Sequence, residues 1–244
     1  MDLGLNIGIS LAIVAFGFLM GSIPTGVIIG KLFFHDDPRN YGSHNPGGTN
    51  TGRAFGKKIG ITVIVLDMAK TIIAFWVPWA ILRFTGIHEQ LWDDGVFYNY
   101  LGLFFAAFGH CFSPWLKFKG GKAVSCFMAS TGGLGWVNFI TCAAIFFPLF
   151  KKRHVMSIAT ITTSVIVTIF QWLMFGVREL LILHTENGQR IMDYAMFNFG
   201  FGGGVFYGWQ QALISTLVMV VLIARHASNI KRIREGNEKP VEWK

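Results

Sequence analysis

The chain has 244 residues, of which 52% are hydrophobic and only 14% are charged, and its mean hydropathy is +0.49. This composition is too apolar for an ordinary soluble domain. Apolar runs of about 20 residues recur, and runs of that length cross a bilayer as helices, so the sequence predicts a polytopic membrane protein. The net charge of +8 does not indicate nucleic-acid binding, because the sequence contains no RNA- or DNA-binding motif.

The apolar runs predict an all-α fold of seven transmembrane helices, forming a single domain over residues 1–244. The predicted spans cover approximately residues 4–31, 61–84, 97–116, 123–130, 136–150, 156–177 and 205–224. The first span contains Pro24 within a glycine-rich stretch at 21–26, which predicts a kink. Glycines at 131–135 interrupt the apolar region 123–150, which forms either two short helices or a re-entrant hairpin. The N-terminal Met1-Asp2 has no basic region, so no cleavable signal peptide is expected.

Charged residues inside the second span lie at Asp67 and Lys70. A spacing of three places both on one face of a helix, where they can pair. Charges inside a membrane are costly unless they face the protein interior. We therefore expect a structural ion pair here, in preference to direct catalysis. The three cysteines lie in apolar stretches and predict packing residues, without a disulfide framework or metal-ligand spacing.

Basic residues are distributed unequally between the two sides of this topology. The loops 31–60, 116–123 and 151–155 and the tail from Arg225 hold five, three, three and six Lys and Arg residues, which are 17 of the 21 in the chain. Since basic loops remain in the cytoplasm, the N-terminus is predicted outside and the C-terminus in the cytoplasm. This distribution also explains the net charge without a nucleic-acid partner.

A polar stretch at 42–53 separates the first two spans and holds four glycines, a proline and Arg53. Glycine and proline disfavour helix, so the composition predicts a loop. Glycines allow close approach to a ligand, hydroxyl and amide side chains supply hydrogen bonds, and the guanidinium of Arg53 matches phosphate. Thr49 and Asn50 could cap the segment that holds Arg53. An anion-binding loop is favoured over a solvated connection.

Two further polar islands are predicted on the same side of the membrane. Lys119 and Lys122 flank a Gly-Gly pair in a flexible cationic turn that suits phosphate, whereas simple membrane anchors would explain the lysines but not the glycines. In the tail, His226 and Asn229 share a face if the last helix continues that far. His226 can donate a hydrogen bond or carry charge, and Asn229 can hold a hydroxyl or phosphate. Together these groups suit two phosphates.

Six short segments carry a resemblance to a known family. They are Gly21-Ser22-Ile23-Pro24, Gly42-Ser43-x-Asn45-x-Gly47-x-Thr49-Asn50-x-x-Arg53, Leu66-Asp67-x-x-Lys70, Gly109-His110, Phe118-Lys119-Gly120-Gly121-Lys122 and His226-x-x-Asn229-Ile230. In this order and spacing they resemble the bacterial acyl-phosphate:glycerol-3-phosphate acyltransferases, from about residue 20 to residue 125 and again in the tail. Three positions depart from the family: His44 and Ala123 stand where it commonly has glycine, and Gly48 where it has alanine.

The resemblance implies an enzyme that transfers a fatty acyl group from acyl phosphate to the 1-hydroxyl of glycerol 3-phosphate. The products are lysophosphatidic acid and phosphate, in the first acylation step of bacterial phospholipid synthesis. It further implies a multi-pass protein of the bacterial plasma membrane with a cytoplasmic active site, no metal and no cofactor. A functional link to the soluble enzyme that makes acyl phosphate is also implied.

The resemblance and the chemistry of the side chains together assign the site residues. The predicted catalytic residues are Ser43, Arg53, Lys122, His226 and Asn229, and the predicted substrate-binding residues are Asn45, Gly47, Thr49, Asn50, Lys119, Gly120, Gly121 and Ser157. Ser157 is the best match to a serine that the family has after its fifth helix. No general base is evident, so a substrate phosphate is expected to accept the proton of the attacking hydroxyl.

Two other classes of protein are compatible with parts of this pattern. A small phosphate-ester transporter also needs a cationic pocket, but a carrier site belongs near the bilayer midplane, and the polar groups here lie at one face. A non-catalytic scaffold that binds anionic lipids would need only the basic loops. Product formation by the purified protein would exclude both classes.

Overall fold

The computed structural model describes residues 2–92, 96–132, 136–180, 208–238, 240, 241 and 243, and within these ranges it contains helices and no β-strand. The α-helices are α1 (Leu3–Ser22), α2 (Thr25–Phe34), α3 (Gly48–Phe55), α4 (Lys57–Phe84), α5 (Val96–Cys111), α6 (Val124–Gly132), α7 (Trp136–Arg153), α8 (Met156–Leu180), α10 (Trp209–Arg225) and α11 (Ala227–Arg234). Short 3₁₀ helices occupy Pro38–Asn40, Ile87–Gln90 and Pro114–Leu116. The predicted all-α fold is confirmed.

The first predicted span consists of two helices, α1 and α2. The side chain of Asp2 caps α1 by accepting a hydrogen bond from the backbone N–H of Gly4 at 2.8 Å. The helix ends before Pro24, because proline lacks an N–H and disfavours helical backbone in the residue that precedes it. The predicted kink is thus a break at Ile23 and Pro24.

The number of membrane spans is only partly established. Within the described ranges, three segments are long and apolar enough to cross a membrane, namely Leu3–Phe34, Lys57–Phe84 and Met156–Gly176, and α10 with α11 would make a fourth if this bent pair forms one span. At nine residues, α6 is only about 14 Å long, which is short of a bilayer core of ~30 Å. The structure therefore supports an integral membrane protein, and the count of seven spans stays a prediction.

Other predicted boundaries were close to those observed. The third span was expected to reach residue 116, but α5 ends at Cys111 and a 3₁₀ turn follows at Pro114. The predicted break in 123–150 lies between α6 and α7, and residues 133–135 are outside the described ranges. The residues at 181–207, including the predicted start of the last span, also lie outside them.

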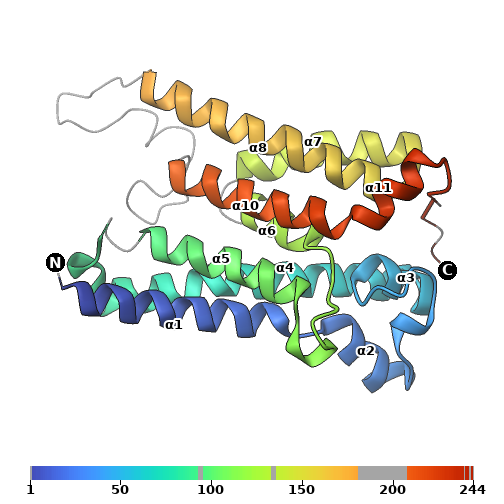
Figure 1. The fold of residues 1–244 in the computed structure, drawn as a ribbon, viewed down its shortest axis with the longest axis horizontal. Helices are drawn as coiled ribbons and strands as arrows, with labels where there is room; N and C mark the ends of the chain where they lie inside the picture. Colours follow the sequence, from blue (N-terminus) through green and yellow to red (C-terminus); the bar gives the residue numbers. More distant parts are fainter. Residues whose placement is uncertain are drawn as a thin grey trace.

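Three helices pack side by side through their backbones: α1, α4 and α5 (Figure 1). A side chain at Gly17 or Gly21 of α1 would overlap backbone atoms of Gly102 or Ala106 in α5. A side chain at Gly102 would in turn overlap the backbone of α4 at Ala74. Small residues at helix contacts permit this close approach inside membranes. These three helices support the polar network at the end of α1 that is described below.

The basic loops gather at one end of the bundle, with α2, α3, α11 and the C-terminus, and the N-terminus lies at the opposite end (Figure 1). The backbone N–H of Val241 donates to the carbonyl of His154 at 2.7 Å, which joins the tail to the loop after α7. The Trp243 indole donates to the carbonyl of Thr49 at 3.1 Å, which joins it to α3. The structure thus brings together segments more than 190 positions apart in the sequence.

The prediction that residues 42–53 do not lie inside a helix was wrong for 48–53, because residues 48–55 form helix α3. Helix α3 packs against the start of α4, where a side chain at Gly60 would overlap the backbone of Gly48 and Gly52, and a side chain at Gly48 would overlap Gly60 and Ile64. Glycine is unfavourable in an isolated helix by ~1 kcal/mol. In this case, contact between two helices outweighs the local preference.

Candidate functional site

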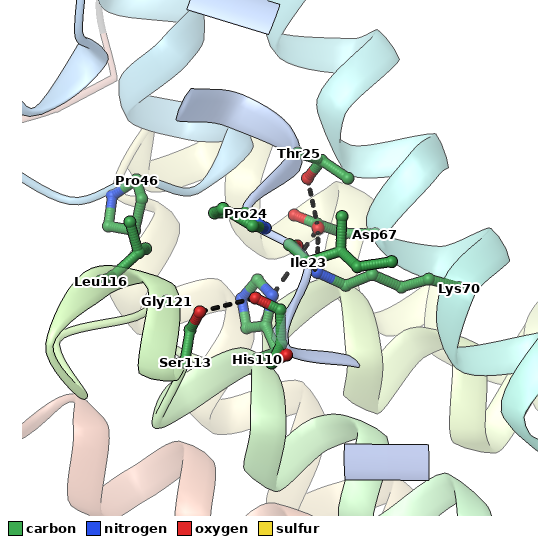
Figure 2. Close-up of a pocket in the computed structure, with 11 residues that line it drawn as sticks. Ile23, Pro24, Thr25, Pro46, Asp67, Lys70, His110, Ser113, Leu116 and Gly121 are labelled. Carbon is green, nitrogen blue, oxygen red and sulfur yellow. Dashed lines mark hydrogen bonds and ion pairs between the residues drawn. The ribbon is translucent and has the colours of Figure 1, made fainter. Parts of the chain in front are cut away.

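A buried polar network lies at the break between α1 and α2 (Figure 2). The carboxylate of Asp67 lies 2.7 Å from Nζ of Lys70, and its Oδ1 accepts a hydrogen bond from Thr25 at 2.6 Å. Lys70 also donates to the carbonyl of Ile23 at 2.8 Å. In a continuous helix this carbonyl would accept a backbone N–H from the following turn. The predicted ion pair between Asp67 and Lys70 is confirmed, and it stabilises the helix break.

The same network supports the cationic turn of the second polar island. Nδ1 of His110 lies 3.6 Å from Oδ1 of Asp67, and the ring packs directly against Gly121, where any side chain would overlap it. The backbone N–H groups of Gly121 and Gly120 donate to the carbonyls of His110 and Cys111, at 2.9 and 3.0 Å. The Gly-Gly pair is therefore required by close packing against α5.

Helix α10 holds this turn from its other side through Arg225. The guanidinium donates to the carbonyl of Gly120 at 3.0 Å and to that of Gly121 at 3.2 Å. Ala123, directly after the turn, has a φ of 57°. This left-handed backbone favours glycine, which explains why the family commonly has glycine there. His44, the other departure of this kind, has a φ of 56°.

The turn separates its two predicted lysines. Lys119 is exposed to solvent, whereas Lys122 points into the protein and its Nζ donates to Oδ1 of Asn229 at 2.6 Å. The amide nitrogen of Asn229 donates to Glu238 at 2.6 Å and to Ser157 at 3.2 Å. Ser157 also donates to Glu238. Nε of Arg232 donates to the other carboxylate oxygen of Glu238 at 2.6 Å. We call these five residues the Asn229 cluster: Lys122, Ser157, Asn229, Arg232 and Glu238.

The Asn229 cluster is buried at its centre and partly buried at Lys122, Arg232 and Glu238, and it carries excess positive charge. Ser157 and Asn229 are only 4% and 6% exposed. The pKa of Lys122 is lowered to about 8, chiefly by burial and also by the positive charges of Arg232 and Arg53, while Glu238 acts in the opposite direction. Burial raises the pKa of Glu238, but hydrogen bonds from Ser157, Asn229 and Arg232 outweigh burial and hold it below its ordinary value. Such a group of donors and cations is suited to an anion.

The last helix does not continue unbroken to Asn229, which was the condition for His226 and Asn229 to share one helix face. The chain bends by 59° between α10 and α11, at His226. His226 and Asn229 are nevertheless both buried at this bend. Because a carbonyl can only accept, Nδ1 of His226, 2.8 Å from the carbonyl oxygen of Leu222, carries the proton. In the neutral ring, Nε2 is then the nitrogen that can accept a hydrogen bond.

The loop before α3 is organised by the side chain of Asn50. Its oxygen accepts from the N–H of Ser43 at 2.9 Å, and its nitrogen donates to the carbonyls of Pro38 and Asn45 at 2.7 and 2.9 Å. The predicted capping by Thr49 and Asn50 was wrong, because both lie inside α3 and its N-cap is Gly47, without a side-chain hydrogen bond. Asn50 instead fixes the shape of the loop.

The predicted site residues thus fall into three groups. In the first group, hydrogen bonds join Lys122, Ser157 and Asn229, and Arg53 is close enough for its charge to act on Lys122. His226 belongs with this group, because it is buried at the bend that leads to Asn229. The second group lies in the adjoining loop and in α3 and consists of Ser43, Asn45, Gly47, Thr49 and Asn50. The last group lies in the turn and consists of Lys119, Gly120 and Gly121. The backbone N–H groups of the two glycines donate to backbone carbonyls of α5. The sequence did not single out Arg232 or Glu238, because the tail from Arg225 contains three glutamates and six basic residues.

The fold and this site define an integral membrane protein of α-helices, with a partly buried cluster of cations and hydrogen-bond donors at one end of its bundle. Residues 11–236 match the family model for glycerol-3-phosphate acyltransferase, and the chain belongs to this family of membrane enzymes.

Known members of the family are similar over nearly their whole length. The chain is 34% identical over 230 residues to the glycerol-3-phosphate acyltransferase of Macrococcus caseolyticus (strain JCSC5402), covering 93% of this chain and 94% of that protein. It is 32% identical over 227 residues to the glycerol-3-phosphate acyltransferase of Staphylococcus aureus (strain JH9), covering 93% and 95%.

Two crystal structures show the same fold. Both are of PlsY (YgiH), an integral membrane glycerol 3-phosphate acyltransferase, and both are 24% identical to this chain. The glycerol 3-phosphate form has a TM-score of 0.70 and covers 96% of either chain. The lysophosphatidic acid form has a TM-score of 0.69, with 95% of this chain and 94% of that chain covered.

Proposed function

We propose that the protein transfers a fatty acyl group from acyl phosphate to the 1-hydroxyl of glycerol 3-phosphate, and releases lysophosphatidic acid and phosphate. Family membership supports the acceptor, and the names of the related crystal forms match acceptor and product. The observation that carries the proposal is the contact of Lys122 with Asn229 beside Ser157, under the charge of Arg53. Cations with neutral donors suit a reaction between two phosphate-bearing substrates.

In this reaction the hydroxyl oxygen attacks the acyl carbonyl carbon, and the bond between that carbon and the phosphate oxygen breaks. The phosphate leaves with the electron pair and accepts the proton of the hydroxyl. Lys122 and Arg53 would neutralise the phosphates, and Ser157, Asn229 and His226 would orient glycerol 3-phosphate by hydrogen bonds.

The two glycine-rich segments would complete the site. Ser43, with its loop held by Asn50, would supply a hydroxyl and backbone donors to a phosphate. Gly120 and Gly121 would let the turn approach the acyl group, which would lie between the spans. In this arrangement the site faces the cytoplasm of a bacterial cell, where a soluble enzyme would supply acyl phosphate.

The purified protein in detergent or a lipid mesophase tests this proposal directly. We expect lysophosphatidic acid and phosphate to appear when palmitoyl phosphate and glycerol 3-phosphate are both present. Palmitoyl-CoA in place of palmitoyl phosphate should give no product. Product from palmitoyl-CoA alone would refute acyl phosphate as the donor, and absence of product from either donor would refute the reaction.

Raising the pH should reveal the titration of Lys122. Its pKa is lowered to about 8 by burial, so the ammonium that binds phosphate loses its proton as the pH rises past that value. We expect kcat/KM for glycerol 3-phosphate to fall about tenfold for each pH unit above 8. In Lys122→Arg the guanidinium stays protonated, so its remaining activity should not show this fall. An identical fall in both proteins would assign the titration to another group.

Labelling of single cysteines should establish the orientation. Ser228 and Glu89 are exposed near opposite ends of the bundle, and the native cysteines, Cys111, Cys126 and Cys142, are all buried. In intact cells, an impermeant maleimide should label Glu89→Cys and leave Ser228→Cys unmodified until the membrane is opened. Labelling of Ser228→Cys in intact cells, or protection of Glu89→Cys, would contradict the proposed topology.

A further inference from the structure

The histidine near the end of α5 lies between the buried ion pair and the cationic turn (Figure 2). Nδ1 of His110 is 3.6 Å from Oδ1 of Asp67, the same oxygen that lies 2.7 Å from Nζ of Lys70. The other edge of the ring faces Gly121, where an added side chain would overlap Nε2 and the two carbon atoms beside it. His110 is only 9% exposed. One edge of the ring therefore faces a carboxylate of α4, and the other limits where the turn can lie.

Hydrogen bonds hold the turn in place on its other sides. The N–H groups of Gly121 and Gly120 donate to the carbonyls of His110 and Cys111, at 2.9 and 3.0 Å. The guanidinium of Arg225 donates to the carbonyls of both glycines. The turn is thus tied to the ends of α5 and α10, and the imidazole ring is the side chain against which Gly121 rests.

The position of Gly121 determines where the next residue places its charge. Lys122 follows Gly121 directly, and its Nζ donates to Oδ1 of Asn229 at 2.6 Å. A hydrogen bond of this length tolerates little displacement of either partner. A shift of about 1 Å in a group that binds substrate can reduce an enzymatic rate by about a hundredfold. Removing the ring edge behind Gly121 would allow such a shift.

We infer that His110 is a positioning residue, whose ring is oriented by Asp67 and holds Gly121 where Lys122 can bind a substrate phosphate. The inference rests on the proposed function, which gives Lys122 this role. The two edges of the ring have separate tasks. The Nδ1 edge supports the buried network of Asp67 and Lys70, and the Nε2 edge sets the position of the turn.

His110→Asn separates these tasks, because the amide of asparagine takes the place of Nδ1 and lacks the part of the ring that faces Gly121. Kinetics of the purified protein should be measured with glycerol 3-phosphate and palmitoyl phosphate varied in turn. KM for one or both should rise about tenfold, with kcat within about threefold of the wild type. A looser turn also lets the ammonium of Lys122 reach solvent, so the fall in kcat/KM should begin at a pH above 8.

His110→Phe makes the opposite change. Phenylalanine keeps a ring against Gly121 and removes the nitrogen that faces Asp67, so KM and the pH dependence should stay close to those of the wild type. Its Tm in detergent should be lower than that of His110→Asn, because the buried carboxylate faces an apolar edge. His88→Asn is the matched control. His88 contacts Arg83 and the carbonyl of Leu82 at the other end of α4, and its replacement should leave KM unchanged.

An unchanged KM and an unchanged pH dependence in folded His110→Asn would overturn the inference. Equal rises of KM in the asparagine and phenylalanine variants would also overturn it, since the role of the ring would then be structural only. If His110→Asn does not fold, His110→Phe decides: a KM near that of the wild type supports the inference, and a raised KM contradicts it.

Failure of the proposed function would be visible separately, as absence of lysophosphatidic acid from the wild type. Binding of inorganic phosphate to the purified protein would then replace kinetics as the measurement. Weaker binding by His110→Asn than by His110→Phe would support the positioning role, and equal binding by the two variants would overturn it.

Discussion

Replacing Lys122 with glutamine should lower kcat/KM by about a hundredfold to a thousandfold. The ammonium is partly buried in the Asn229 cluster and donates to Asn229 at 2.6 Å. Glutamine could still donate a hydrogen bond but would carry no charge to neutralise phosphate. With substrate bound, Lys122 would pair with a phosphate. Removing one partner from a buried charged pair costs about 3–5 kcal/mol, and a comparable loss in the transition state gives an effect of this size.

Lys117→Gln is the matched control for this variant. Lys117 belongs to the same basic segment, but it is exposed to solvent, and no role in the site is assigned to it. Its kcat/KM should stay within about twofold of the wild type, because an isolated surface charge contributes little. Steady-state kinetics of both variants, with Tm measured in the same detergent, make the comparison. Near-normal kcat/KM in folded Lys122→Gln would remove this lysine from the site.

Gly21→Ala should cause the largest loss of stability among single methyl additions in α1. The new methyl group would overlap the backbone of Ala106 in α5, so the two helices would have to separate. Overpacking of a core costs about 1–3 kcal/mol even when flexible side chains can yield, and here the obstacle is backbone. We expect a markedly lower Tm in detergent and a lower yield of folded protein.

Gly8→Ala tests the same substitution on the same helix without the obstacle. No atom lies within 4 Å of the position that its methyl group would occupy. Alanine is favoured over glycine in a helix by up to about 1 kcal/mol, so the Tm of this variant should be unchanged or higher. Equal effects of the two substitutions would show that helix propensity, and not the contact between α1 and α5, controls stability at Gly21.

Much of the site could be inferred from the sequence, in part from the chemistry of the residues and in part, as for Ser157, from the resemblance to a known family. The ion pair of Asp67 and Lys70 followed from their spacing on one helix face and from the cost of leaving either charge unpaired in a membrane. Lys122, Ser157 and Asn229 were each selected as site residues, and the structure joins them by hydrogen bonds. Their roles in catalysis stay predictions until the kinetics are measured.

Glu238 could not have been selected in this way. Its neighbours in the sequence are polar or charged and typical of a solvated tail, and nothing in their spacing indicates burial. Its environment depends on the 59° bend at His226, which turns α11 and the tail back towards Ser157. A bend between two helices depends on what packs against it, and local sequence carries little of that information.

The sequence was sufficient to establish an all-helical membrane protein, because apolar runs and the cost of unpaired backbone groups in lipid leave few other solutions. Its basic loops also predicted which segments share one end of the bundle. It did not establish that 48–55 is helical or that Gly21 sits against the backbone of α5. Both features arise from close contact between segments far apart in the chain, whose energies outweigh the local preferences of glycine.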